Sequence, residues 1–192
     1  MKKVGVLGLQ GAVAEHVEKL GRFENVKPLV VKYKSEIEAV DALIIPGGES
    51  TAIGKLLADF DLTSTLKSRI LSGMPVWGTC AGMIILAKKL CNDECRHLEV
   101  MDIEVMRNGY GRQIDSFSTT VNLPEISTNE IPLVFIRAPY VVNVAHNVKV
   151  LLRVNENIVA CRQENMLATS FHPELTEDLS FHKYFVDMIK DN

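Results

Sequence analysis

The chain has 192 residues, of which 47% are hydrophobic and 23% charged, and its formal net charge is −3. This length predicts a single domain over residues 1–192 with a sizeable core, and the composition excludes a disordered chain. A nucleic-acid partner is not expected because no lysine and arginine cluster outnumbers the acids. Membrane insertion is not expected because the apolar runs are short, and four cysteines without an export signal favour the cytoplasm.

The first half of the chain alternates strand patterns with helix patterns. Continuous apolar runs predict buried strands at 2–9, 27–33, 41–46 and 74–79. Apolar residues at helical spacing predict helices at 11–21, after 50, and at 81–90. Strands that alternate with helices indicate a parallel, doubly wound sheet, and hence an α/β three-layer sandwich.

The second half is richer in strands. Residues 100–171 hold several short strand patterns separated by polar turns, which predict antiparallel strands at the sheet edge and a small flanking sheet. The final stretch has apolar residues at i, i+3, i+4, i+7 and i+8 from Phe181, so it is expected to form a closing amphipathic helix.

The segment Gly78-Thr79-Cys80-Ala81-Gly82 lies where a predicted strand meets a predicted helix. Its G-x-C-x-G form is the thiol version of a nucleophile elbow, a strained turn that glycines relieve of crowding. The helix N-terminus favours the thiolate form of Cys80. The alternative is a structural cysteine buried in a tight turn.

His172 and Glu174 form the second candidate pair, in "SFHPEL" directly after a predicted strand. Pro173 favours extended geometry for His172, and residues two apart in an extended segment point the same way. Glu174 is therefore expected to hydrogen-bond one imidazole nitrogen and leave the other to face a thiol. A simple H-P-E turn is the alternative, but with Cys80 the pair makes a Cys-His-Glu set.

Two glycine-containing turns end neighbouring strands. In "PGGES" (46–50), successive glycines can turn backbone N–H groups towards an oxyanion, or they can simply lead into a helix capped by Glu49 or Ser50. In "GLQG" (8–11), the Gln10 carboxamide could brace a nearby loop or cap a turn.

Other cysteines and histidines are expected to have structural roles only. Cys91, Cys95 and His97 have the spacing C-x₃-C-x-H, which fits no standard zinc pattern, so no metal is expected. His146 and His182 are expected at the surface or on a helix face.

Six motifs occur in order between residues 5 and 178: "GVLGLQGAVAEH", "PGGEST", "GTCAGMI", "RNGYGRQIDSF", "FIRAP" and "SFHPELTED". This set resembles the class I, triad-type glutamine amidotransferases. Within them, "GLQGAV", the 107–117 motif and "FIRAP" resemble the glutaminase subunits of pyridoxal 5′-phosphate synthases. The resemblance implies a flavodoxin-like fold and no cofactor.

The resemblance also implies the reaction and its residues. L-Glutamine would be hydrolysed to L-glutamate and ammonia through a γ-glutamyl thioester on Cys80, with His172 as acid and base and Glu174 orienting it. The oxyanion would be held by backbone N–H groups of Gly48 and Ala81, near Gln10. The substrate would be bound by Gly48, Glu49, Ser50, Arg107, Ile136 and Arg137. For Arg107 the alternative is a structural ion pair, and for Arg137 it is a buried pair or a backbone role.

The expected partner is a separate (β/α)₈-barrel synthase subunit that receives the ammonia, in a hetero-oligomeric complex. Gln10 and the helix at 12–20 are expected at or near the interface, because they lie at the catalytic edge of the sheet. Two alternatives stay open: a glutaminase subunit for another pathway, such as histidine or purine biosynthesis, and a non-catalytic regulatory relative on the same fold.

Overall fold

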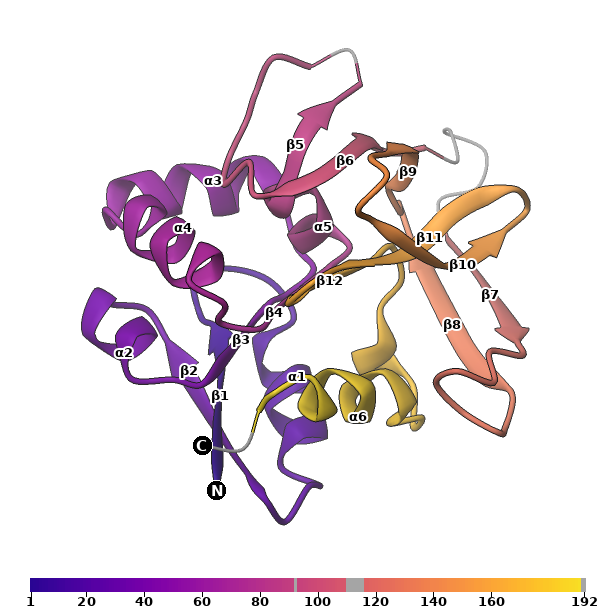
Figure 1. Cartoon of the computed structure of the whole chain (residues 1–192), viewed down its shortest axis with the longest axis horizontal. Helices are drawn as coiled ribbons and strands as arrows, with labels where there is room; N and C mark the ends of the chain where they lie inside the picture. The colour runs from indigo at the N-terminus through magenta and orange to yellow at the C-terminus, as the bar shows by residue number, and fades with distance from the viewer. Residues whose placement is uncertain (92, 110–115, 191–192) are drawn as a thin grey trace.

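The computed structural model describes residues 1–91, 93–109 and 116–190, so most of the 107–117 motif lies outside the described residues. Helices lie on both faces of one large central sheet (Figure 1), and a small second sheet lies beside it. The predicted α/β three-layer architecture is confirmed, including its antiparallel extension.

The parallel part of the sheet has the order β2-β1-β3-β4-β12. All four pairings between these neighbours are parallel. Strands β3 and β4 are buried along their whole length, as their continuous apolar sequences require. The strands are β1 (Lys2–Leu7), β2 (Val26–Val31), β3 (Ala42–Ile45), β4 (Val76–Thr79) and β12 (Met166–Thr169).

Antiparallel strands extend the sheet beyond β12, in the order β11-β9-β6, and β5 then pairs with β6 in parallel. Their bounds are β5 (Ala87–Leu90), β6 (Met101–Met106), β9 (Tyr140–Val144), β10 (Lys149–Val154) and β11 (Asn157–Gln163), with β10 paired to β11. The small sheet is the antiparallel hairpin of β7 (Ser116–Val121) and β8 (Ile131–Ile136).

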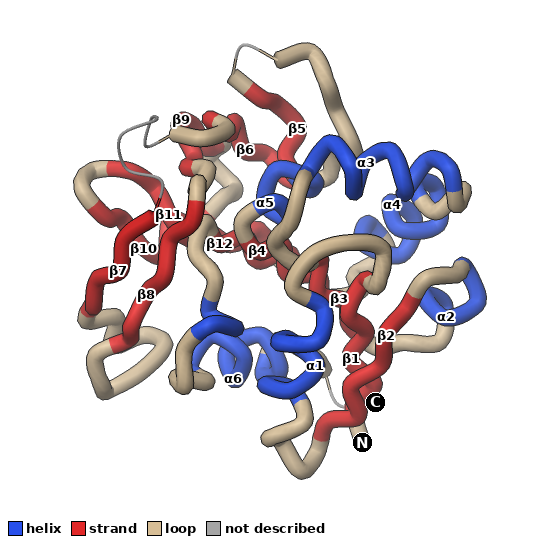
Figure 2. Tube along the Cα trace, turned by 180° about the vertical axis from the view of Figure 1, so that it is seen from behind, coloured by secondary structure: helices blue, strands red, loops and turns tan. Residues whose placement is uncertain are grey.

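The helices divide the interior into two cores. Both tube and ribbon views place α1 (Val13–Leu20) beside α6 (Ser180–Asp187) on one face of the sheet (Figure 2). The other face carries α2 (Lys34–Glu38), α3 (Ser50–Asp59), α4 (Thr63–Leu71) and α5 (Ala81–Leu86). Strand β3 serves both cores, because Ile44 packs towards α1 and α6 while Leu43 and Ile45 pack towards α3 and α5.

The expected helix at 81–90 is wrong in its last four residues. Helix α5 ends at Leu86, Ala87 adopts extended dihedral angles (φ −62°, ψ 140°), and 87–90 form β5 against β6. Lys88 and Lys89 are exposed there, so the apolar pattern stops where the helix does. Helices α2 and α4 have no counterpart among the expected elements.

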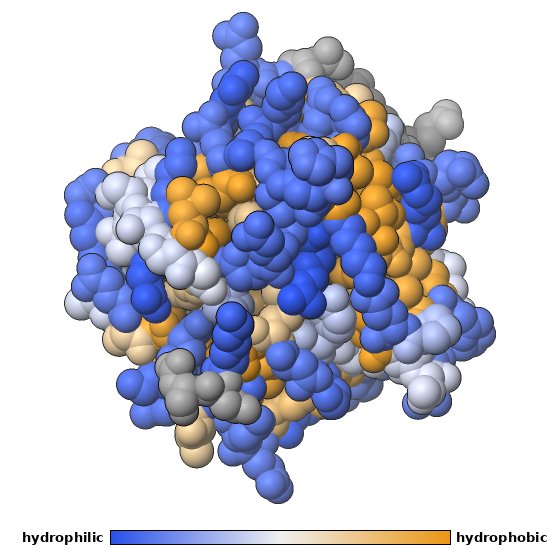
Figure 3. Space-filling view, in the orientation of Figure 1, coloured by the Kyte–Doolittle hydropathy of each residue, from blue (hydrophilic) through white to orange (hydrophobic). Residues whose placement is uncertain are grey.

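Hydrophilic residues cover most of the face seen in Figure 3, and hydrophobic ones gather on the side that β8, β10 and β11 occupy in Figure 1. Among the described residues, no helix is long and apolar enough to cross a membrane.

Helix α5 begins in close contact with the sheet. A Cβ atom built on Gly82 would lie 2.1 Å from the carbonyl oxygen of Ile45, in β3. Only a residue without a side chain fits this approach, so Gly82 lets α5 begin close to β3.

We expect Gly82→Ala to lower the free energy of unfolding by about 1–3 kcal/mol, because α5 must move away from β3 to admit the methyl group. Gly21→Ala is the matched control, since its Cβ would meet only ordinary contacts at 3.4 Å and its φ is −65°. Its cost should stay within about 0.5 kcal/mol. Urea unfolding measures both, and equal losses would contradict the close approach.

Candidate active site

A cleft of about 720 Å³ opens at the carboxyl ends of the parallel strands, where open α/β sheets bind their ligands. Every predicted site residue lines this cleft except Glu174, which is buried behind His172. The cleft also includes residues that the sequence patterns did not single out, among them Glu15, Asn108 and Pro139.

Cys80 stands at the junction of β4 and α5. Its φ of 48° and ψ of −103° are strained values for a residue with a side chain, as a nucleophile elbow requires. Its backbone N–H donates to the carbonyl oxygen of Thr169 at 2.8 Å, which fixes the turn to β12. The thiol is 7% exposed, and Sγ lies 3.9 Å from the carbonyl oxygen of Ile136. These features favour the elbow over the alternative of an inert buried cysteine.

His172 and Glu174 are bonded to each other as predicted. His172 Nδ1 lies 2.7 Å from Glu174 Oε1, and the carboxylate is 2% exposed. The local backbone differs from the extended segment that was expected, because Pro173–Leu175 form a 3₁₀ turn that carries Glu174 back beneath the imidazole. The His172 N–H donates to Val134 in β8 at 2.8 Å, so the second sheet also positions this histidine.

His172 and Cys80 meet across Gly47. A Cβ atom on Gly47 would lie 2.4 Å from His172 Cε1 and 3.3 Å from Cys80 Cβ, so glycine is required between them. Burial disfavours the charged imidazole, but hydrogen bonds to Cys80 and Glu174 outweigh it and raise the pKa of His172 to about 10. His172 therefore holds a proton at neutral pH.

The "PGGES" turn is braced from the end of β1. Gln10 Oε1 accepts a hydrogen bond from the Glu49 N–H at 2.8 Å, and the Ala12 N–H donates to the Gly47 carbonyl oxygen at 3.0 Å. Gln10 therefore braces a neighbouring loop, as one of the two expectations had it. Ala81 is the first residue of α5, where backbone N–H groups have no partner within the helix.

Two arginines line the cleft. Arg107 donates to Asp93 Oδ2 at 2.7 Å, so the structural ion pair foreseen as an alternative is present at the edge of the cleft. The Cys95 N–H, and then Arg107, lower the pKa of Asp93. Arg137 follows β8 with φ 44° and is exposed, which excludes the buried pair considered for it.

His16 was missed as a polar neighbour of the site. Its Nε2 lies 3.4 Å from Glu174 Oε2 and 3.3 Å from Thr79 Oγ1, while its Nδ1 lies 3.1 Å from His182 Nε2. Both histidines are 0% exposed, so of the two positions expected for His182 the surface is wrong, and the residue lies on the buried face of helix α6. The sequence did hold one signal for the burial of His16, because its spacing places it on the same helix face as Val13, Val17 and Leu20.

Burial keeps both histidines neutral. Desolvation, followed by electrostatic interactions with His182 and His172, lowers the pKa of His16 well below its usual value. Desolvation and then Lys19 lower the pKa of His182 to about 3. Glu174 is thus flanked by a protonated histidine on one side and a neutral one on the other.

Comparisons with known proteins give the family of the chain. A model of the SNO glutamine amidotransferase family matches residues 6–191. The chain is 72% identical to pyridoxal 5′-phosphate synthase subunit PdxT of Ruminiclostridium cellulolyticum, over 98% of this chain and all of that one. It is 54% identical to the protein of the same name from Clostridium botulinum, over the full length of both.

Solved structures share the fold. A crystal structure of a glutamine amidotransferase superposes with a TM-score of 0.90 at 41% identity, over 97% of this chain and 98% of that one. The structure of PurLQS from Thermotoga maritima superposes with a TM-score of 0.69 at 17% identity, over 98% of this chain and 97% of that one, and shares the fold alone. This chain belongs to the SNO glutamine amidotransferase family.

Proposed function

We propose that this chain hydrolyses L-glutamine to L-glutamate and ammonia, as the glutaminase subunit of a pyridoxal 5′-phosphate synthase. The observation that carries the proposal is the Cys80 elbow beside a protonated, Glu174-bonded His172 at the floor of a cleft. The relatives at 72% and 54% identity are both named as PdxT subunits of that synthase, which supports the choice of pathway.

The reaction begins with attack by the thiolate of Cys80, whose proton His172 already holds, on the carboxamide carbon of the glutamine side chain. The resulting oxyanion is held by the backbone N–H groups of Gly48 and Ala81. His172 then gives its proton to the amide nitrogen, the C–N bond breaks, and ammonia leaves a γ-glutamyl thioester on Cys80. Glu174 holds the imidazole ring of His172 in place in both of its protonation states.

Water completes the cycle. His172 takes a proton from a water molecule, whose oxygen attacks the thioester carbonyl carbon. The C–S bond breaks, glutamate leaves, and the proton on His172 restores the Cys80–His172 pair.

The walls of the cleft suit an amino acid substrate. Arg107 and Arg137 supply cations for the α-carboxylate, and a guanidinium has five N–H donors, more than the Asp93 ion pair uses. The Glu49 carboxylate and the Ile136 carbonyl oxygen suit the α-ammonium group. Gly48 and Ser50 also line the cleft, and Ser50 is the first residue of α3.

The ammonia is delivered to a separate (β/α)₈-barrel synthase subunit in a hetero-oligomeric complex. Gln10 and α1 lie at the rim of the cleft, where a docking partner can set the Gly47–Gly48 turn. We place this single domain, with its free thiols Cys80, Cys91, Cys95 and Cys161, in the cytoplasm.

Cys80→Ala should abolish ammonia release from glutamine, a loss of at least about 10³-fold, because no other group supplies the nucleophile. The measurement is glutaminase activity with and without the barrel partner. Cys95→Ala, an exposed thiol outside the cleft, is the matched control and should be fully active. Activity in Cys80→Ala would refute the mechanism, and stimulation of the wild type by a histidine-pathway synthase instead would refute the pathway.

Glu174→Gln should lower the pKa of His172 and reduce kcat by roughly 10²–10⁴-fold, because a neutral amide stabilises the imidazolium poorly. Because the pKa of His172 is raised from 6.5 in the unfolded chain to about 10 in the fold, protonation of His172 stabilises the fold fully below pH 6.5. This contribution is lost as the pH rises towards about 10.

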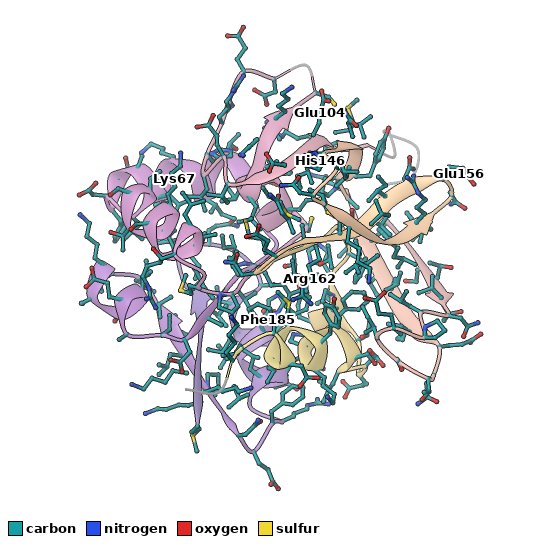
Figure 4. The ribbon with its side chains drawn as sticks, in the orientation of Figure 1. Lys67, Glu104, His146, Glu156, Arg162 and Phe185 are labelled. Atoms are coloured by element: carbon teal, nitrogen blue, oxygen red, sulfur yellow. The ribbon has the colours of Figure 1, made fainter. Side chains whose placement is uncertain are left out.

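Unfolding measured between pH 6.5 and 10 should therefore show a smaller loss of stability in Glu174→Gln than in the wild type. Glu156→Gln is the control, because Glu156 is exposed on the β10–β11 turn (Figure 4) and should change neither quantity. An unchanged pH dependence in Glu174→Gln would contradict the assigned role.

Gln10→Ala should lower the partner-stimulated glutaminase rate, because the Glu49 N–H loses the acceptor that fixes the turn. Asn143→Ala removes an exposed amide from β9 and should leave the rate unchanged. If Gln10→Ala were stimulated as strongly as the wild type, Gln10 would have no part in setting the turn.

A further inference from the structure

A buried line of polar groups continues behind the proposed triad. It runs from Glu174 through His16 on α1 to His182 on α6, the two helices that lie side by side in Figures 1 and 2. The contacts are 3.4 Å from Glu174 Oε2 to His16 Nε2 and 3.1 Å from His16 Nδ1 to His182 Nε2. None of these three side chains is more than 2% exposed. The catalytic cleft is thus joined to the interior between α1 and α6.

The second oxygen of Glu174 needs this contact. Oε1 is bonded to His172, but no described residue gives the buried Oε2 a hydrogen bond of ordinary geometry. A buried ionised carboxylate is costly unless its oxygens meet donors or positive charge. The His16 N–H, placed 3.4 Å away, is the group positioned to compensate Oε2.

The tautomers of the two histidines follow from their surroundings. If His16 carries its proton on Nε2, it presents a donor to Glu174 and Thr79, and the His182 Nε2–H donates to His16 Nδ1. His182 Nδ1, which has no partner among the described residues, is then only an acceptor. The opposite tautomers would set a lone pair of His16 against the carboxylate and bury an unpaired N–H on His182, which costs more.

We propose that His16 is a positioning residue for the glutaminase reaction: its Nε2–H holds Glu174 Oε2 so that Oε1 faces His172, and His182 fixes the tautomer of His16. The expected kinetic effect rests on the proposed function. The tautomers of His16 and His182 do not, because they depend only on how the chain folds.

If His16 served only to fill space, an apolar side chain of similar size could replace it. Trp77 contacts both histidines through ring edges, with centroids 5.7 Å from His16 and 5.0 Å from His182, so an apolar ring could fill the space. An apolar side chain could not supply the N–H to Glu174. Substitutions of similar size that differ in this donor therefore separate positioning from packing.

The kinetic test compares His16→Leu, His16→Gln and His16→Asn in the complex with the barrel partner. His16→Leu should lower kcat about tenfold, the rate equivalent of one hydrogen bond to a charged group, with KM within about twofold of the wild type. His16→Gln, whose amide N–H can reach the position of Nε2, should recover most of kcat, while the shorter His16→Asn should not. An unchanged kcat in His16→Leu, or equal losses in Leu and Gln variants, would overturn the proposal.

The second test needs no activity and no variant. The ¹⁵N chemical shifts of the imidazole nitrogens in the full-length chain distinguish protonated from bare positions. We expect His16 and His182 to be neutral at neutral pH with the proton on Nε2 of each. A proton on Nδ1 of His16 would overturn the proposal even if the variants failed to fold.

The exposed His146, on the turn after β9 (Figure 4), provides the control. His146→Leu should keep the wild-type kcat, and a loss equal to that of His16→Leu would count against a specific role for His16. If the wild type released no ammonia with the partner present, the proposed function would fail, while the ¹⁵N measurement would still decide the tautomers.

Discussion

The structure around the candidate site depends on one buried carboxylate, that of Glu174, which is only 2% exposed. Glu174 is held by a 2.7 Å contact to His172 on one oxygen and faces His16 on the other. Such a charge is tolerated inside a protein only where donors surround it. The 3₁₀ turn at Pro173, the position of α1 and the protonated state of His172 all serve that requirement, and the proposed thiol chemistry depends on the same proton.

The cleft is built by both halves of the chain. The parallel strands supply the turns that carry Gln10, Gly48 and Cys80, whereas the β8 hairpin supplies Ile136, Arg137 and the carbonyl group that anchors the His172 backbone. The cleft includes strained backbone: Cys80, Asn108 and Arg137 line it with φ between 44° and 48°, although other described residues with positive φ lie elsewhere. Strain of this kind persists only where the surrounding structure holds it, so a scaffold from two sheets gives the site its rigidity.

The sequence predicted those parts that depend on local pattern. The parallel strands, the G-x-C-x-G elbow and the H-P-E pair have signatures within a few residues, and the family resemblance extended them to the cleft-lining arginines. Burial of His182 was not predictable in this way, because it depends on α1 and α6 meeting across 166 residues of chain. The strand β5 was misjudged since an apolar run beside lysines fits a helix end equally well, and only pairing with β6 decides it. The catalytic roles themselves remain predictions.

Trp77 is the single tryptophan of the chain, and it lies fully buried against both interior histidines. Its indole N–H donates to Thr169 at 3.0 Å, on the strand whose backbone also fixes Cys80. Fluorescence from one indole therefore reports on one place, the junction between the catalytic turn and the α1–α6 layer. The protein therefore carries an intrinsic fluorophore at this junction, and changes there can be followed without a label.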